Sequence, residues 1–173
     1  EGTRGTMAVD WEERIDMQRL RRERKARALE RLRETDLGSI LLIDDPNVRY
    51  VTGLAMTGGS GADHYTLLTE DGDVVHWDTA DHASNQRFNC PWLEDIRYAC
   101  PGLGNVPRAS GRASARDWLK DRMAETVYTA MEEYGVADEP MGIDVANGAL
   151  VEKFDDRGVE VDTTAASELM LDA

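Results

Sequence analysis

The densest group of potentially reactive side chains lies in the segment His76-Trp-Asp-Thr-Ala-Asp-His82. Asp78, Asp81 and His82 stand at positions i, i+3 and i+4, so a helix would place them on one face, and carboxylates with an imidazole can bind a divalent metal. A metal site also needs further ligands and partners behind them. We therefore interpret Asp78 as the N-cap of a helix that runs towards Phe88, with Asp81 favourable in its first turn.

Four aspartates are candidate strand-end carboxylates of the kind that a small metal-dependent hydrolase, such as a nuclease, would use. They are Asp44, Asp45, Asp78 and Asp144. The chain contains 34 acidic residues, so finding four at strand ends is weak evidence for such a site. A metal-dependent nuclease assay would test this hypothesis.

A glycine-rich loop from Leu54 to His64 contains the sequence Gly58-Gly59-Ser60-Gly61. Glycine loops bind phosphate when a Lys-Ser or Lys-Thr pair or a helix N-terminus follows, and neither follows here. We therefore interpret the segment as a loop without a phosphate site.

The elements that would position these residues alternate between strands and helices. Ile40 to Ile43 is an apolar run of strand length, and Asp45-Pro46-Asn47 supplies an N-cap candidate with proline at the first helical position. Tyr65 to Trp77 is a predicted hairpin with the turn signal Asp71-Gly72. The other predicted elements are a helix at 16–33, a strand at 96–99, a helix from Ser110 or Ser114 to Tyr134, a strand at 141–145, a helix at 147–156 and a strand at 159–161. This alternation predicts an α/β sandwich with a mixed sheet of about six strands and helices on both faces.

The predicted first helix carries an excess of positive charge. Residues 19–34 contain eight basic and three acidic side chains, a net charge of +5 that leaves −19 for the rest of the chain. A nucleic-acid surface is one interpretation, but the acidic remainder would repel phosphates. We favour a helix whose arginine stems, including Arg21 and Arg24, cover the core while their charged groups meet acidic surface of the same or a second subunit.

Length and composition limit the class of protein. The 173 residues suit one domain, and the net charge of −14 comes with only three lysines. Such an acidic surface stays hydrated at high salt, so we expect a halophilic source, although a GC-rich genome would favour the same composition. No apolar run approaches the roughly 18 residues of a membrane span and no signal peptide is evident. We expect a cytoplasmic protein in which Cys90 and Cys100 are free thiols.

The sequence Asn47-Val-Arg-Tyr-Val-Thr-Gly53 resembles the Asn-Ile-Arg-Tyr-Leu-Thr-Gly signature of the amino-terminal domain of creatinase, prolidase and aminopeptidase P, which are pita-bread metallopeptidases. The order of elements from about Asp16 to Ala173 is also similar to that domain. The resemblance implies a three-layer sandwich of ribonuclease H-like architecture. It divides the chain into an N-terminal extension (1–15), the domain itself (16–162) and the start of a linker helix to a C-terminal catalytic domain (163–173).

The same resemblance implies a non-catalytic domain of a hydrolase similar to Xaa-Pro dipeptidase or aminopeptidase P. The domain would pair subunits into a homodimer and control access and substrate selection at the metal site of its own C-terminal catalytic domain. A divalent metal pair would be held in that catalytic domain, whereas this chain is expected to bind no cofactor, no metal, no nucleic acid and no membrane. The substrate would be a peptide or another small molecule.

Two groups of site residues follow from the resemblance. The family signature supplies Asn47, Arg49, Tyr50 and Gly53. The segment from Leu54 to Tyr65 is similar to a substrate-access loop, with the candidates Met56, Asp63, His64 and Tyr65. Creatinase carries an aromatic and a basic residue just before the next strand, where this chain has Gly61, Ala62 and Asp63, which argues against creatinase activity.

An alternative hypothesis is a free-standing α/β domain that binds a small ligand. Its pocket would be flanked by the glycine loop and the segment from His76 to His82, and the chain would then end naturally at Ala173.

Overall fold

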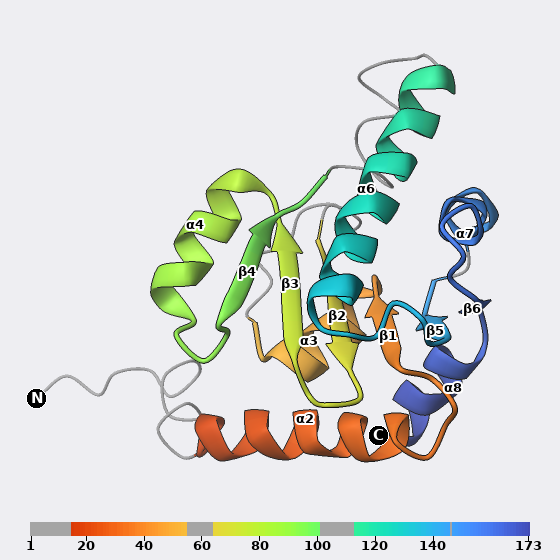
Figure 1. Ribbon diagram of the computed structural model, residues 1–173. Helices are drawn as coiled ribbons and strands as arrows, with labels where there is room; N and C mark the ends of the chain where they lie inside the picture. The colour runs from red at the N-terminus through yellow and green to blue at the C-terminus, as the bar shows by residue number, and fades with distance from the viewer. Residues whose placement is uncertain (1–14, 55–63, 101–112, 146) are drawn as a thin grey trace, which may run out of the picture.

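The computed structural model describes residues 15–54, 64–100, 113–145 and 147–173. The strands are β1 (Ser39–Leu42), β2 (Tyr65–Thr69), β3 (Val74–Asp78), β4 (Asp95–Tyr98), β5 (Met141–Ile143) and β6 (Val161–Asp162). The helices are α2 (Met17–Leu32), α3 (Asp45–Thr52), α4 (Ala80–Asn89), α6 (Ala113–Glu133), α7 (Gly148–Asp155) and α8 (Ala165–Asp172). The six strands form one sheet in the order β4-β3-β2-β1-β5-β6 (Figure 1).

The sheet is mixed, as the sequence predicts. Strand β2 pairs antiparallel with β1 and with β3, whereas the pairs β3–β4, β1–β5 and β5–β6 are parallel. All strands except β2 therefore point the same way, and their carboxyl ends meet at one edge of the sheet (Figure 1). We call this edge the carboxyl edge. It is where open α/β sheets commonly place their ligand sites.

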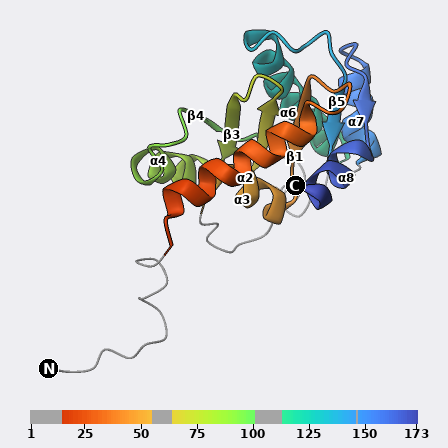
Figure 2. The same ribbon diagram turned by 90° about the horizontal axis from the view of Figure 1, so that it is seen from below.

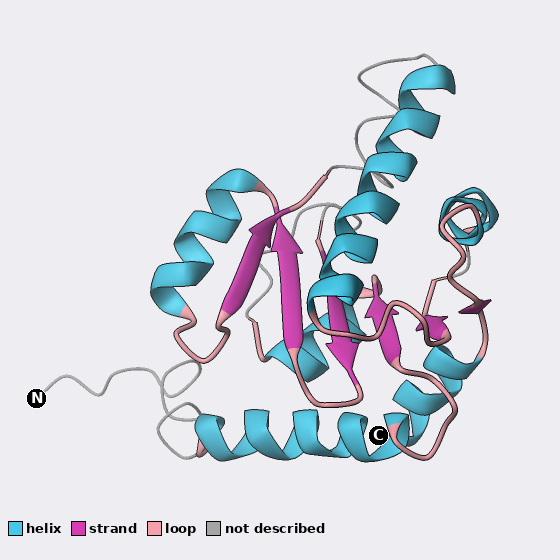
Figure 3. Cartoon of the chain, viewed as in Figure 1, coloured by secondary structure: helices cyan, strands magenta, loops and turns pink. Residues whose placement is uncertain are grey.

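Side chains alternate between two hydrophobic cores, one on each face of the sheet. Leu41 of β1 and Trp77 of β3 belong to the core under α6 and α7, together with Met131 and Phe154. Ile40 and Leu42 of β1 belong to the other core, to which α2, α3 and α8 contribute. Figure 3 shows these helices on the two sides of the strands, and the predicted three-layer sandwich is confirmed.

The hairpin of β2 and β3 follows from its turn. Gly72 has a φ of +94°, a conformation that glycine adopts without strain, and its N–H donates to the carbonyl of Thr69 at 2.9 Å. Four residues separate the strands, so the turn is longer than the two-residue type that Asp71-Gly72 suggested. The resulting register places Thr66 opposite His76.

Two predicted helix caps are wrong. Helix α3 begins at Asp45 itself, and Asp44 occupies its N-cap position without a capping bond from its side chain. Asp78 ends β3, and Thr79 is the N-cap residue of α4. The predicted last strand is also shifted, because β6 covers only Val161–Asp162.

Helix α2 runs across the sheet beside α3 and α8 (Figure 2). Its N-cap is Asp16, whose carboxylate accepts the N–H of Arg19 at 2.8 Å. The guanidinium groups of Arg21 and Arg24 do not meet acidic surface within the described part of the chain: they lie over aromatic rings, Arg21 over Trp92 at 3.8 Å and Arg24 over Tyr50 at 5.5 Å. Within the described part of the chain, cation–π contacts thus take the place of the ion pairs expected with its own acidic surface, and ion pairs of these arginines with a second subunit stay a prediction.

Two further expectations concern cysteines and membranes. Cys90 and Cys100 are free thiols, of which Cys90 is buried. Among the helices that the structure describes, none has the length and apolar character needed to span a membrane.

Candidate functional site

Six polar side chains gather at the carboxyl edge, on the face that α3 covers, and we call them the histidine–aspartate cluster. Its members are His64, His76, Asp78, His82, Gln86 and Asp45. Asp45 begins α3, His64 immediately precedes β2, His76 and Asp78 lie in β3, and the last two belong to α4.

His76 is completely buried at the centre of this cluster. Its Nδ1 lies 2.8 Å from Oγ1 of Thr66, the residue opposite it on β2, whereas its Nε2 has no hydrogen-bond partner and stands 3.7 Å from Oδ2 of Asp78. Burial lowers the pKa of His76 below its ordinary value, although Asp78 acts in the opposite direction. His76 is therefore neutral at pH 7, and none of its surface is exposed in this structure.

Asp78 is the buried acceptor of the cluster, with 2% of its surface exposed. Burial alone would raise the pKa of Asp78, but His76, the N–H of Thr79 at 2.7 Å and the amide of Gln86 together bring it below its ordinary value. The carboxylate is thus ionised and held by donors, and it joins the end of β3 to α4.

The cluster does not fit a metal ion. Asp78 has one imidazole nitrogen on each side, from His76 at 3.7 Å and from His82 at 3.6 Å. Nevertheless, over the residues that the structure describes, no three His, Cys, Asp or Glu side chains are placed to hold a metal. The contacts of Asp78 with Thr79 and Gln86 join the end of β3 to α4.

His64 and Leu54 are anchored to the two ends of α3. Nε2 of His64 lies 2.8 Å from Oδ1 of Asp45, the first residue of the helix. The N–H of Leu54 donates to Oγ1 of Thr52, the last residue of the helix, at 3.2 Å. Both His64 and Leu54 are buried. One short helix therefore fixes both flanks of the segment 55–63.

The signature residues hold α3 in place. The amide of Asn47 donates to Oδ2 of Asp144 at 3.0 Å, and the hydroxyl of Tyr50 donates to the carbonyl of Ala173 at 2.6 Å. Gly53 ends the helix with a φ of +69°, and its N–H donates to the carbonyl of Arg49 at 2.9 Å. The side chain of Arg49 is exposed. Asn47 thus connects α3 to the end of β5, and Tyr50 connects it to the end of α8. Gly53 closes the C-terminal turn of α3 itself.

Asp144 joins the ends of two neighbouring strands. One of its oxygens accepts the N–H of Ile43 at 2.7 Å, and the other accepts the N–H of Asp44 at 3.1 Å besides the amide of Asn47. Burial raises the pKa of Asp144, and these donors oppose the shift without cancelling it. The four strand-end aspartates of the sequence do lie near the carboxyl edge, but three of them make internal contacts through their side chains: Asp45, Asp78 and Asp144.

The substrate-access candidates are only partly described. Met56, Asp63 and the glycine run at 58–61 lie outside the described residues. Tyr65 is wholly buried, stacks on Trp77 with 5.1 Å between ring centroids, and accepts the N–H of Cys100 at 3.3 Å. Burial raises the pKa of Tyr65 to about 12. Tyr65 is therefore a core residue, and His64 is the candidate that remains at the edge.

Sequence reasoning missed three contacts of the site. The pairing of Thr66 with His76 differs by one residue from the register of a two-residue turn at Asp71-Gly72, which would place Thr66 opposite Trp77. The contact of Gln86 with Asp78 and the contact of Asp45 with His64 carry no local signal, because each joins separate elements.

Comparisons with known proteins match this architecture. A family model described as Creatinase/Prolidase N-terminal domain matches residues 24–170. A search of curated proteins found no match. Among solved structures, a Xaa-Pro aminopeptidase from Streptococcus pyogenes gives a TM-score of 0.59 at 15% identity, covering 88% of this chain and 98% of that one. The N-terminal domain of the cytoplasmic peptidase PepQ from Mycobacterium tuberculosis gives 0.53 at 18% identity, covering 85% and 98%.

A third structure is much longer than this chain. The Xaa-Pro dipeptidase from Bacillus anthracis gives a TM-score of 0.56 at 14% identity, and the match covers 85% of this chain but 34% of that protein. At such identities the likeness establishes the fold. The family model spans nearly the whole chain, with its signature residues on α3, and the chain therefore belongs to the creatinase/prolidase N-terminal domain family.

Proposed function

We propose that this chain is the N-terminal domain of a larger metal-dependent hydrolase similar to Xaa-Pro dipeptidase or aminopeptidase P. In this proposal it controls access to the metal site of its own C-terminal catalytic domain and takes part in selecting the substrate, which is a peptide or another small molecule. The observation that carries the proposal is the anchoring of Leu54 and His64 to the two ends of α3.

Anchored flanks suit a segment that selects ligands. Loops that bind substrates are commonly carried by rigid elements, because only then do their residues meet the ligand in a fixed geometry. Here α3 is itself fixed, by Asn47 to Asp144 and by Tyr50 to Ala173. The segment 55–63 is thus joined to fixed residues at both flanks, Leu54 at the C-terminal end of α3 and His64 beside the carboxyl edge, which favours His64 and its neighbours as the access surface.

We place the divalent metal pair in the C-terminal domain rather than in this chain. The described part of this chain offers no set of three metal-binding side chains, and the two residues at the centre of the histidine–aspartate cluster, His76 and Asp78, are buried. The expected consequence is that this chain alone neither hydrolyses Xaa-Pro dipeptides nor binds two metal ions. Hydrolysis by the isolated chain would contradict the proposal.

The access role is tested in the full-length protein with two Xaa-Pro dipeptides, Ala-Pro and Phe-Pro. His64→Ala and Asp45→Ala each remove one partner of the anchor, so they should change the ratio of kcat/KM between the two substrates. Arg27→Ala, on an exposed position of α2, is the control and should leave that ratio unchanged. An unchanged ratio in both anchor variants would show that His64 has no part in substrate selection.

A homodimer and a cytoplasmic location complete the proposal. The homodimer rests on the family resemblance, and exposed apolar side chains such as Phe88 and Tyr98, on α4 and the edge strand β4, are compatible with a covered surface there. Sedimentation velocity of the full-length protein tests it, with Phe88→Ser expected to weaken the dimer and Leu171→Ser, on α8, as the control. A monomeric wild type would exclude the dimer.

A further inference from the structure

A cleft of about 390 Å³ lies at the opposite edge of the sheet from the histidine–aspartate cluster. It opens between α2 and the amino ends of β3 and β4, and Thr52 of α3 also lines it. Its volume is within the range of about 300 to 1,000 Å³ that is typical of small-molecule sites.

One wall of the cleft is basic. Arg21, Arg22 and Lys25 of α2 line it, and none of the three lies within ion-pair distance of a carboxylate in the described residues. Other basic side chains of the same helix are neutralised locally, since Arg19 pairs with Glu23 and Arg31 pairs with Glu34. Three basic side chains of α2 that form no ion pair with a described carboxylate therefore lie together along this wall.

The base of the basic wall is held rigid by Trp92. Its indole N–H donates to the carbonyl of Thr52 at 2.8 Å, and the guanidinium of Arg21 lies over its ring. Val51, Val74 and Leu93 add apolar surface. Because Arg21 is fixed by stacking, little side-chain freedom would be lost when a ligand meets it.

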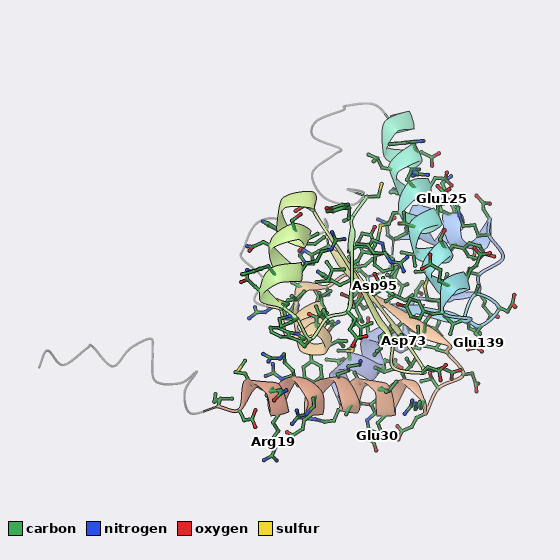
Figure 4. All side chains as sticks on the ribbon, turned by 60° about the vertical axis from the view of Figure 1, so that its left-hand side comes forward. Arg19, Glu30, Asp73, Asp95, Glu125 and Glu139 are labelled. Carbon is green, nitrogen blue, oxygen red and sulfur yellow. The ribbon has the colours of Figure 1, made fainter. Side chains whose placement is uncertain are left out.

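The facing wall is acidic. Asp73, Glu94 and Asp95 line it, and Figure 4 shows Asp73 and Asp95 on the body above α2, while Arg19 and Glu30 point away from it. Oδ2 of Asp95 forms an ion pair with the guanidinium of Arg97 at 2.6 Å and accepts a hydrogen bond from the hydroxyl of Tyr134 at 3.0 Å. Asp73 and Glu94 make no ion pair with a described basic side chain.

We propose that this cleft binds a small zwitterion, a free amino acid or a short peptide, with its carboxylate against Arg22 and Lys25 and its ammonium group against Asp73 and Glu94. Opposite charges on facing walls, neither of them paired across the cleft, match a ligand that carries both signs. The net charge of −14 also decides against a simple anion, because the field of the whole chain repels a phosphate but not a molecule without net charge.

The two sites share only Thr52, which lines the cleft and accepts the N–H of Leu54, and the variants that test the access role (His64, Asp45) are separate from those that test the cleft (Arg22, Lys25, Glu94). The proposal for the cleft also holds whether or not the chain carries a catalytic domain. An unchanged ratio of kcat/KM in the dipeptide assay would contradict the access role but would not bear on ligand binding in the cleft. Failure of a ligand to bind in the cleft would likewise not bear on the access role.

Binding is tested by NMR titration of the chain, with the indole N–H signal of Trp92 as the site-specific probe, assigned by Trp92→Phe. The ligands are glycyl-L-leucine, its N-acetyl form, its C-terminal amide and inorganic phosphate. We expect glycyl-L-leucine to shift the Trp92 signal with a Kd in the millimolar range. Each capped form should bind about tenfold more weakly, since each loses one charged contact. Phosphate should bind weakest.

Three variants locate the two charged contacts. Arg22→Gln with Lys25→Gln should weaken glycyl-L-leucine about tenfold without affecting its amide, and Glu94→Gln should weaken the free dipeptide without affecting the N-acetyl form. Arg27→Gln removes one positive charge from an exposed position of the same helix outside the cleft and should leave all affinities unchanged. No titration of the Trp92 signal, or phosphate binding as tightly as the dipeptide, would overturn the proposal.

Discussion

Gly53 is the signature residue whose replacement tests two physical effects at once. Its φ of +69° lies in the left-handed region, and an added Cβ would overlap Cγ and Cδ of Arg21. Gly135 is a matched control, because its φ is +75° and nothing lies within 4 Å of the place where its Cβ would be. Both Gly→Ala changes carry the same strain and the same entropic gain in the unfolded chain, but only the change at Gly53 meets Arg21.

The magnitudes follow from these contacts. The left-handed conformation costs an L-residue about 1 to 2 kcal/mol, offset in part by the lower entropy of the unfolded chain, so Gly135→Ala should cost about 1 kcal/mol. Gly53→Ala also displaces the stem of Arg21 and its guanidinium from Trp92, which adds at least about 1 kcal/mol. We expect a total of about 2 to 3 kcal/mol, measured as the free energy of unfolding in urea.

A double-mutant cycle isolates the contact. In an Arg21→Ala background the overlap is gone, so Gly53→Ala should cost no more than Gly135→Ala. Equal costs at the two glycines in the wild-type background would refute the packing of Arg21 on Gly53. If Gly53→Ala still costs more stability than Gly135→Ala in the Arg21→Ala background, the extra cost comes from a neighbour other than Arg21.

Three further predictions concern single contacts. Asp144→Ala removes the acceptor of two backbone N–H groups and of the Asn47 amide, so it should lower the free energy of unfolding in urea by about 3 kcal/mol. A loss below about 1 kcal/mol would show that water takes the place of the carboxylate. Tyr50→Phe keeps the ring under Arg24 but removes the hydrogen bond to the carbonyl of Ala173. The free energy of unfolding in urea should therefore fall by about 1 kcal/mol, and no change would contradict this hydrogen bond between α3 and the end of α8. His76 has a lowered pKa when folded, so the unfolded chain binds more protons and stability should fall as the pH drops below about 6.5, by at most about 1.4 kcal/mol per pH unit. His76→Gln should flatten this dependence in urea unfolding at pH 5 to 7, and an unchanged slope would assign it to another group.

The order of strands and helices could be predicted because each element carries its own local pattern. Ile40 to Ile43 is apolar throughout because β1 is buried on both faces, with all four of its residues in contact with the two cores or with neighbouring strands. The hairpin itself was predicted from Asp71-Gly72, but its register was not, because the observed pairs such as Leu68 with Val74 are one residue away from those of a two-residue turn. Boundaries were less accurate: the helix after β1 begins at Asp45, one residue earlier than the proline pattern indicated.

The candidate site was harder to predict because its contacts join distant parts of the chain. Asp78 has the sequence context of a helix cap, yet its carboxylate ends a strand and is buried beneath α4, where Gln86 reaches it. Arg21 could not be assigned to Trp92 from any local pattern, since 71 positions separate them. The family signature was recognisable, but the partners of Asn47 and Tyr50, namely Asp144 and Ala173, became evident only in the folded chain.

The most direct test of the central claim is to sequence the reading frame beyond Ala173 in the source DNA. If this chain is the N-terminal domain of a metal-dependent hydrolase, the frame should continue and encode two aspartates, one histidine and two glutamates at the spacing of a metal pair. A stop codon directly after Ala173 would contradict that claim and leave a free-standing domain.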